Sequence, residues 1–249
     1  MFKEVFSSVS DAAASKAAYL RKNPSGYFIL SMLAGMYIGF GVLLTNTIGG
    51  VLQGAAATKV VLGCSFGVAL SLVVMAGAEL FTGNNLVMSA GVLDRKVALK
   101  DAVKLWVVCW IGNLVGSVLL GALFVCAGLC SDATLKFVET GAGAKASIPF
   151  LPLLMRGILC NILVCLAVWC ATKLKSESAK LIMIFWCLYA FITSGFEHSI
   201  ANMTLFSAAL MGGAAVTAGG CAYNLAVVTL GNMIGGILFV SVPYYLSKK

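Results

Sequence analysis

The only histidine of this 249-residue chain stands next to a glutamate inside an otherwise apolar stretch, GFEHSIAN at residues 195–202. A histidine can donate a hydrogen bond or exchange a proton near neutral pH. A carboxylate among apolar residues is costly unless it has a partner. Glu197 and His198 therefore predict a site that handles protons or small polar solutes.

The same pattern occurs earlier in the chain, as GAELFTGN at residues 77–84. The equivalent glycines, glutamates and asparagines of the two segments are each 118 residues apart. Two polar interruptions at corresponding places are typical of paired broken helices that meet at a transport site. The first copy has Leu80 where the second has His198, so the histidine is the asymmetric, titratable element.

Most polar residues of the two segments have a structural interpretation. We expect Glu79 and Glu197 to accept hydrogen bonds, either from backbone N–H groups freed by the breaks or from a lysine or arginine. Asn84 and Asn202 would satisfy loop backbone. His198 can itself be structural, neutral and bonded to backbone, or can donate to a permeating ion. Glycine adopts conformations that interrupt a helix, which predicts the breaks at Gly77, Gly83 and Gly195.

The composition places these segments in a membrane. Hydrophobic residues make up 61% of the chain and charged residues 10%, against about 25% charged in a soluble domain. Spanning helices need roughly 20 apolar residues. We predict a single all-α domain with six spans, of which the second and fifth are broken: Tyr27–Ile48, Val60–Leu80, Leu105–Cys126, Ile148–Ala171, Leu181–Leu210 and Tyr223–Tyr245.

The net charge of +8 reflects topology and not a nucleic-acid partner. With both termini in the cytoplasm, only Lys59, Lys136, Lys145 and Arg156 among the 17 basic residues fall outside, as the positive-inside rule requires. Residues 1–22 lack the apolar core of a signal peptide. Their apolar residues recur at helical spacing, which predicts an amphipathic helix on the inner surface; a frayed terminus is the alternative.

The repeat extends to the third and sixth spans, where GNLVG (residues 112–116) matches GNMIG (residues 231–235). Each half, about residues 27–126 and 145–245, has an odd number of spans, so the halves must have opposite orientations. We assign the glycines of these two motifs to close helix packing. The nine cysteines form no CxxC pair, so we expect no metal or cofactor; a disulfide between Cys126 and Cys130 remains open.

The motifs ELFTG (residues 79–83) and GFEHSIANM (residues 195–203) resemble the signatures of the formate/nitrite transporter family. The resemblance covers about residues 23–245. The sequence is similar to the bacterial nitrite channel branch and also to the hydrosulfide channel branch. The resemblance implies an aquaporin-like protomer in the bacterial cytoplasmic membrane, assembled as a homopentamer with one pore per protomer. Members pass small monovalent anions or their conjugate acids.

The resemblance also implies roles for individual residues. Gly83 departs from the formate channels, which tend to have serine there, and this departure leaves the preferred anion open. The similarity to the nitrite channel branch makes nitrite the first expectation, with hydrosulfide and formate as alternatives. Arg156 is a further candidate for attracting the anion. The family pattern matches His198, Thr82 and Asn161 at the centre, Lys145 in the outer vestibule, Phe66, Leu70 and Phe191 at an inner constriction, and Leu80 and Phe81 at an outer one.

Two other classes of protein remain as alternatives. A water or glycerol pore shares the broken-helix plan, but this chain lacks paired Asn-Pro-Ala boxes. An intramembrane enzyme needs a nucleophile and base, or a metal. Glu197 and His198 alone do not suffice, because adjacent residues of a helix point about 100° apart. Two mechanisms also remain open, passage of the anion itself and passage of the neutral acid.

Overall fold

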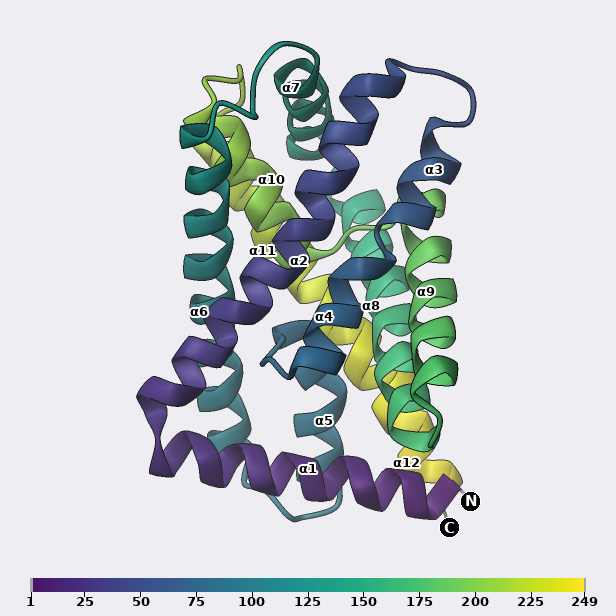
Figure 1. The fold of residues 1–249 in the computed structure, drawn as a ribbon. Helices are drawn as coiled ribbons and strands as arrows, with labels where there is room; N and C mark the ends of the chain where they lie inside the picture. The colour runs from purple at the N-terminus through teal and green to yellow at the C-terminus, as the bar shows by residue number, and fades with distance from the viewer. Residues whose placement is uncertain (1, 249) are drawn as a thin grey trace.

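The computed structural model describes residues 2–248 and contains only helices in that part of the chain. Six helical segments are long and apolar enough to cross a membrane. This confirms the predicted six-span, all-α architecture. α1 lies flat across one end of the molecule, beside both chain termini, and α7 lies at the opposite end (Figure 1). We call these ends the α1 face and the α7 face.

The helices form two halves with the same order. The first half is α1 (Phe2–Lys22), α2 (Pro24–Leu52), α3 (Thr58–Ser65), α4 (Gly67–Ala76), α5 (Phe81–Leu93) and α6 (Leu99–Cys126). The second is α7 (Asp132–Ala146), α8 (Phe150–Lys173), α9 (Glu177–Ser194), α10 (Ser199–Met211) and α11 (Ala218–Gly236). A π-helical turn, Ile237–Ser241, and α12 (Val242–Ser247) complete the sixth span. Each half therefore begins with a helix that precedes its first span.

Both second spans of the halves are broken at a glycine. Gly77 has φ +78° and Gly195 has φ +75°, in the left-handed region that other residues rarely adopt. The chain then runs extended for a few residues before α5 and α10 begin. Gly83 lies inside α5, so the expectation that it breaks the helix is wrong: the interruption ends before Phe81. The first half has an additional interruption at Phe66, between α3 and α4.

The glycines of the third and sixth spans pack against neighbouring backbone, in agreement with their predicted role. A Cβ at Gly116 would lie 1.9 Å from the carbonyl oxygen of Met32, and one at Gly235 would lie 2.3 Å from that of Ile158. Such contacts leave room only for hydrogen, so α6 approaches α2 and α11 approaches α8 closely. All nine cysteines are free, including Cys126 and Cys130.

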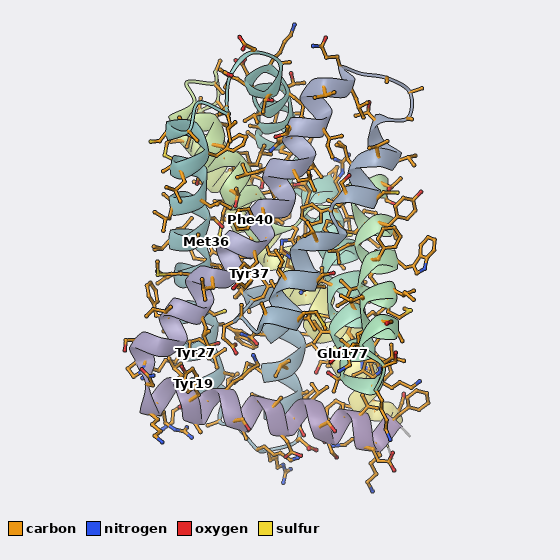
Figure 2. The ribbon with its side chains drawn as sticks, in the orientation of Figure 1. Tyr19, Tyr27, Met36, Tyr37, Phe40 and Glu177 are labelled. Carbon is orange, nitrogen blue, oxygen red and sulfur yellow. The ribbon has the colours of Figure 1, made fainter. Side chains whose placement is uncertain are left out.

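α1 is held to the rest of the protein on both of its sides. One side buries apolar residues at helical spacing: Val5, Phe6, Val9, Ala13, Ala17 and Leu20. The other makes an ion pair with the segment after α5, where Lys96 binds Asp11 at 2.7 Å. Asp94 accepts hydrogen bonds from Ser10 and from Lys248. Tyr19 and Tyr27 lie side by side where α1 meets α2, with ring centroids 6.3 Å apart (Figure 2).

Candidate functional site

His198 lies at the centre of the molecule, between the two broken spans. It is 3% exposed and is the N-cap residue of α10. Its Nδ1 accepts the backbone N–H of Ala201 at 3.1 Å. In a neutral imidazole the proton is then on Nε2, so Nε2–H donates to Thr82 Oγ1, 3.0 Å away on α5. The broken spans thus bring the asymmetric histidine into contact with the other half of the repeat.

Two asparagines hold the half-helices in place by equivalent contacts. Asn113 Oδ1 accepts the N–H of Phe81 at 2.9 Å, and its Nδ2 donates to the carbonyls of Ser31 and Glu79. Asn232 Oδ1 accepts the N–H of Ser199 at 2.9 Å. Its Nδ2 donates to the carbonyls of Gly157 and Glu197. Backbone groups left unpaired by the breaks therefore find partners within the protein, as membrane depth requires.

The glutamate of the first half is paired with a lysine from α1. Lys16 Nζ lies 2.5 Å from Glu79 Oε1, with side-chain exposures of 24% and 11%. The second carboxylate oxygen accepts from Tyr27 and from Asn84, each at 3.0 Å. The negative charge of Glu79 is thus balanced near the α1 face, and the carboxylate ties α1, α2 and α5 together.

The glutamate of the second half has an equivalent partner near the α7 face. Lys145 Nζ on α7 lies 2.6 Å from Glu197 Oε1, with side-chain exposures of 28% and 3%. Asn202 donates to Glu197 Oε2 at 2.7 Å and to Asn224 Oδ1 at 2.8 Å. Of the two partner types considered for Glu79 and Glu197, lysine is the one observed. Asn84 and Asn202 bind these carboxylates and not loop backbone.

Three cavities follow one another between the two faces. The α7-face cavity, about 250 Å³, is lined by Lys145, Asn202 and His198. The central cavity is about 10 Å³, room for about one water molecule. The α1-face cavity, about 420 Å³, is lined by Lys16, Glu79 and Asn84. Two wider cavities, each with a lysine and an asparagine in its wall, therefore flank a narrow, mostly apolar centre.

The apolar residues between these cavities group differently from the expectation. Phe66 and Phe191 line both the central and the α7-face cavity, and their rings meet edge to face at 5.5 Å. Leu70 and Leu80 line both the central and the α1-face cavity. The predicted grouping, with Phe66, Leu70 and Phe191 inside and Leu80 and Phe81 outside, is wrong, because Phe66 and Phe191 stand on the Lys145 side.

Phe81 lies away from this row of cavities. It contributes to an apolar groove of about 470 Å³ between α6 and α11, lined also by Trp106, Trp110 and Met233. As the first residue of α5 it points sideways while Leu80, the residue before it, faces the centre. Adjacent residues at a helix start project in different directions, so both could not line one constriction.

Asn161 and Arg156 occupy places that the sequence did not indicate. Asn161 is fully buried, and its Nδ2 donates to the carbonyls of Thr82 and Asn232 at 3.2 and 2.6 Å. It supports the backbone behind Thr82 and does not line the central cavity. Arg156 is exposed and does not line the α7-face cavity; its carbonyl accepts the N–H of Glu197 at 3.2 Å.

The sequence reasoning missed Lys16, Tyr27, Asn113, Asn224 and Asn232. Asn113 and Asn232 had a visible signal, because each is the polar residue inside a repeated glycine motif. Lys16 had no such signal, since it belongs to α1 and precedes the repeat that is visible in the sequence, which starts at about residue 27. Tyr27 and Asn224 are polar residues at the starts of spans, where such residues are ordinary.

Six spans in two inverted halves, with two half-helices meeting between cavities that each have a lysine in the wall, define a membrane channel or transporter. The formate/nitrite transporter family model matches residues 3–246, nearly the whole chain. The chain belongs to this family, whose members are channels and transporters of small anions and not enzymes.

Individual relatives agree with this assignment. The chain is 40% identical to the nitrite transporter NirC of Escherichia coli (strain K12), over 98% of this chain and 92% of that protein. It is 36% identical to a probable formate transporter of Methanothermobacter thermautotrophicus, covering 96% of each chain. A solved FNT family ion channel superposes with TM-score 0.94, at 38% identity and 98% coverage of both chains. A pentameric formate channel with formate bound superposes with TM-score 0.79, at 30% identity, over 91% of this chain and 98% of that one.

Proposed function

We propose that the chain is a nitrite channel in which His198 and Thr82 form the central transport site. The observation that carries the proposal is the buried Nε2–H to Oγ1 hydrogen bond between these residues, at the narrow point between two lysine-lined cavities. The 40% identity to nitrite transporters supports nitrite as the substrate. Asn161 supports the site through the carbonyl of Thr82.

Lys145 and Lys16 act as the first contacts for the anion, one at each face. Each lysine is neutralised by its glutamate but remains partly exposed, so it can attract an anion without trapping it. The carboxylates Glu79 and Glu197 hold the lysines at the mouths, while Gly77, Gly195, Asn84 and Asn202 maintain the shape of the two breaks. The two mouths are therefore built alike, and transport can proceed in either direction.

The central cavity imposes the main barrier. A bare anion that leaves water for a space of about 10 Å³ between apolar side chains has a large desolvation cost. His198 lowers this cost by donating from Nε2, a hydrogen bond it otherwise makes to Thr82. If the anion instead takes a proton from water in the adjoining cavity, while His198 keeps its own, a neutral acid crosses the leucine pair Leu70 and Leu80. Anion current distinguishes the first route from the second, which is electroneutral.

The same proposal includes the setting of the channel. We place the α1 face in the cytoplasm of a bacterial cell, with residues 1–22 as a surface helix and residues 23–249 as one channel domain. The excess of lysine and arginine on that face supports this orientation. A homopentamer in the lipid bilayer is supported by the pentameric formate channel that superposes on 91% of the chain.

Flux into proteoliposomes tests the function directly. We would measure nitrite, formate, hydrosulfide and chloride from about pH 5 to about pH 8, the range in which histidine titrates. Fast nitrite flux with weak flux of the other three supports the proposal. Dominant formate flux would move the protein to the second candidate, which the formate relatives favour, and dominant hydrosulfide flux to the third. No flux of any of the four from folded protein contradicts the channel function.

A further inference from the structure

The α7-face cavity has polar side chains from several helices, and nearly all of them already have partners in the protein. Lys145 is bound to Glu197. Asn202 donates to Glu197 and Asn224. His198 is engaged through both ring nitrogens, with Ala201 and Thr82. Thr45 donates its hydroxyl proton to the carbonyl of Val42 at 2.9 Å.

Asn46 is the exception among the polar residues that line this cavity. It is 6% exposed, and its Nδ2 is buried with no hydrogen-bond partner in the protein. Val42, Thr45 and Asn46 all line the cavity, and their spacing places them on one face of α2. The amide therefore belongs to the cavity wall and not to a polar network of the fold.

A buried polar group without a partner is rare and needs an explanation. The fold does not need Asn46, because a leucine or valine would fill the same wall without losing a hydrogen bond. The repeat does not require an asparagine either: by the contacts that make Met32 and Ile158 equivalent, the residue of α8 that corresponds to Asn46 is Thr172, whose hydroxyl donates to the carbonyl of Val168. The remaining explanation is a partner that is present only when the cavity is occupied.

We propose that Asn46 is a substrate-contacting residue, which binds a small monovalent anion in the α7-face cavity that Lys145 and His198 also line. This inference rests on the proposed function and adds a specificity-determining contact to it. Rotation of the amide exchanges its N–H₂ and C=O ends. The N–H₂ end binds the anion, and the C=O end accepts from a conjugate acid, so one residue serves the solute on both sides of a proton transfer.

Nitrite flux of an Asn46→Leu variant tests the contact. Leucine keeps the volume and removes both polar atoms. A hydrogen bond to a charged group is worth enough that we expect the half-saturating nitrite concentration to rise about tenfold. Maximal flux at high nitrite should stay within about twofold, because the central site is untouched. Thr47→Val is the matched control on the same helix, because Thr47 donates to the carbonyl of Leu43 and does not line the cavity. It should leave both quantities unchanged.

Binding can also be observed without transport. With ¹⁵N-labelled asparagine, the side-chain amide signal that disappears in Asn46→Leu identifies Asn46, and nitrite should shift this signal in a saturable way. A shift without flux in wild type would uphold the site while the proposed channel function fails. Flux without a shift, and with an unchanged half-saturating concentration in Asn46→Leu, would overturn the site and leave the function standing.

A second variant keeps the test decisive if leucine prevents folding. Asn46→Asp has nearly the same shape and places a negative charge in the cavity wall. It should raise the half-saturating nitrite concentration further than leucine does, because the new carboxylate repels a nitrite ion in the same cavity. An Asn46→Asp protein with wild-type nitrite dependence would contradict the proposal.

Discussion

The N-termini of α5 and α10 have equivalent asparagine and glutamate contacts but different N-cap residues. Each is clamped by an asparagine, Asn113 or Asn232, and each is preceded by a lysine-paired glutamate. At the N-cap position α10 has His198, whose Nδ1 caps its own helix, while α5 has Leu80 and no side-chain cap. The symmetric residues build the site, and the single asymmetric position gives it chemistry.

The N-terminal N–H groups of the two helices also have different side-chain partners. A helix N-terminus presents free N–H groups and partial positive charge. In α10 one of these N–H groups, that of Ala201, donates to Nδ1 of His198, and Nε2 of the same ring faces Thr82. In α5 the N-cap residue provides no side-chain cap. The side-chain partner of the α5 terminus is therefore Asn113, which binds the N–H of Phe81 from another helix, and the α10 terminus is capped by its own histidine.

The largest expected effects concern the shared scaffold. Asn113→Leu removes the acceptor for the N–H of Phe81, and Asn232→Leu removes the acceptor for the N–H of Ser199. Each change also removes the amide donor to the carbonyl of the preceding glutamate, so we expect each to lower the free energy of unfolding by roughly 3 kcal/mol. Thermal unfolding in detergent measures this. A large effect from one variant and none from the other would show that the two clamps are equivalent in geometry only.

The two ion pairs should differ in a smaller but ordered way. Lys145→Met leaves Glu197, 3% exposed, without its cation, and Lys16→Met does the same to Glu79, 11% exposed. Breaking a buried pair costs roughly 3 kcal/mol, and we expect the better-buried Glu197 to show the larger loss of stability.

The double variants provide the control for this pair of changes. Lys145→Met with Glu197→Gln, and Lys16→Met with Glu79→Gln, remove both charges and should recover most of the stability in thermal unfolding. No recovery in either would mean that the lysines act through packing and not through charge.

The smallest effect concerns the attachment of α1. The hydrogen bond from Lys248 lowers the pKa of Asp94 below its usual value. A carboxylate whose pKa is lower in the folded state stabilises the fold at any pH above its unfolded-state pKa, which is about 4. This stabilisation is lost as the pH falls through the folded-state pKa. Hydrogen exchange of α1 amides should therefore increase below about pH 4, and Asp94→Asn should show about threefold faster exchange at neutral pH. Exchange that is the same in both proteins at neutral pH would contradict a role for Asp94 in holding α1.

Much of this comparison was visible in the sequence, because it depends on repeated residues. The spans follow from long apolar runs, and the breaks at Gly77 and Gly195 follow from the pattern 118 residues apart. α7 was not predicted, since its short helix buries only Val138 and Ala142 and lacks a clear apolar stripe. The pairing of Lys16 with Glu79 and the sides on which Phe66 and Leu80 stand depend on how the helices cross, which no local pattern records.

The central claim is that His198 carries the chemistry of the transport site, and His198→Leu tests it most directly. This change makes the second half match the first, which already has leucine at the equivalent position. We would compare nitrite flux of wild type and variant across pH in proteoliposomes, with size and thermal unfolding as checks of folding. We expect a folded protein, less stable by about 1 kcal/mol for the lost cap, with nitrite flux reduced at least about a hundredfold. Wild-type flux with an unchanged pH profile would contradict the account.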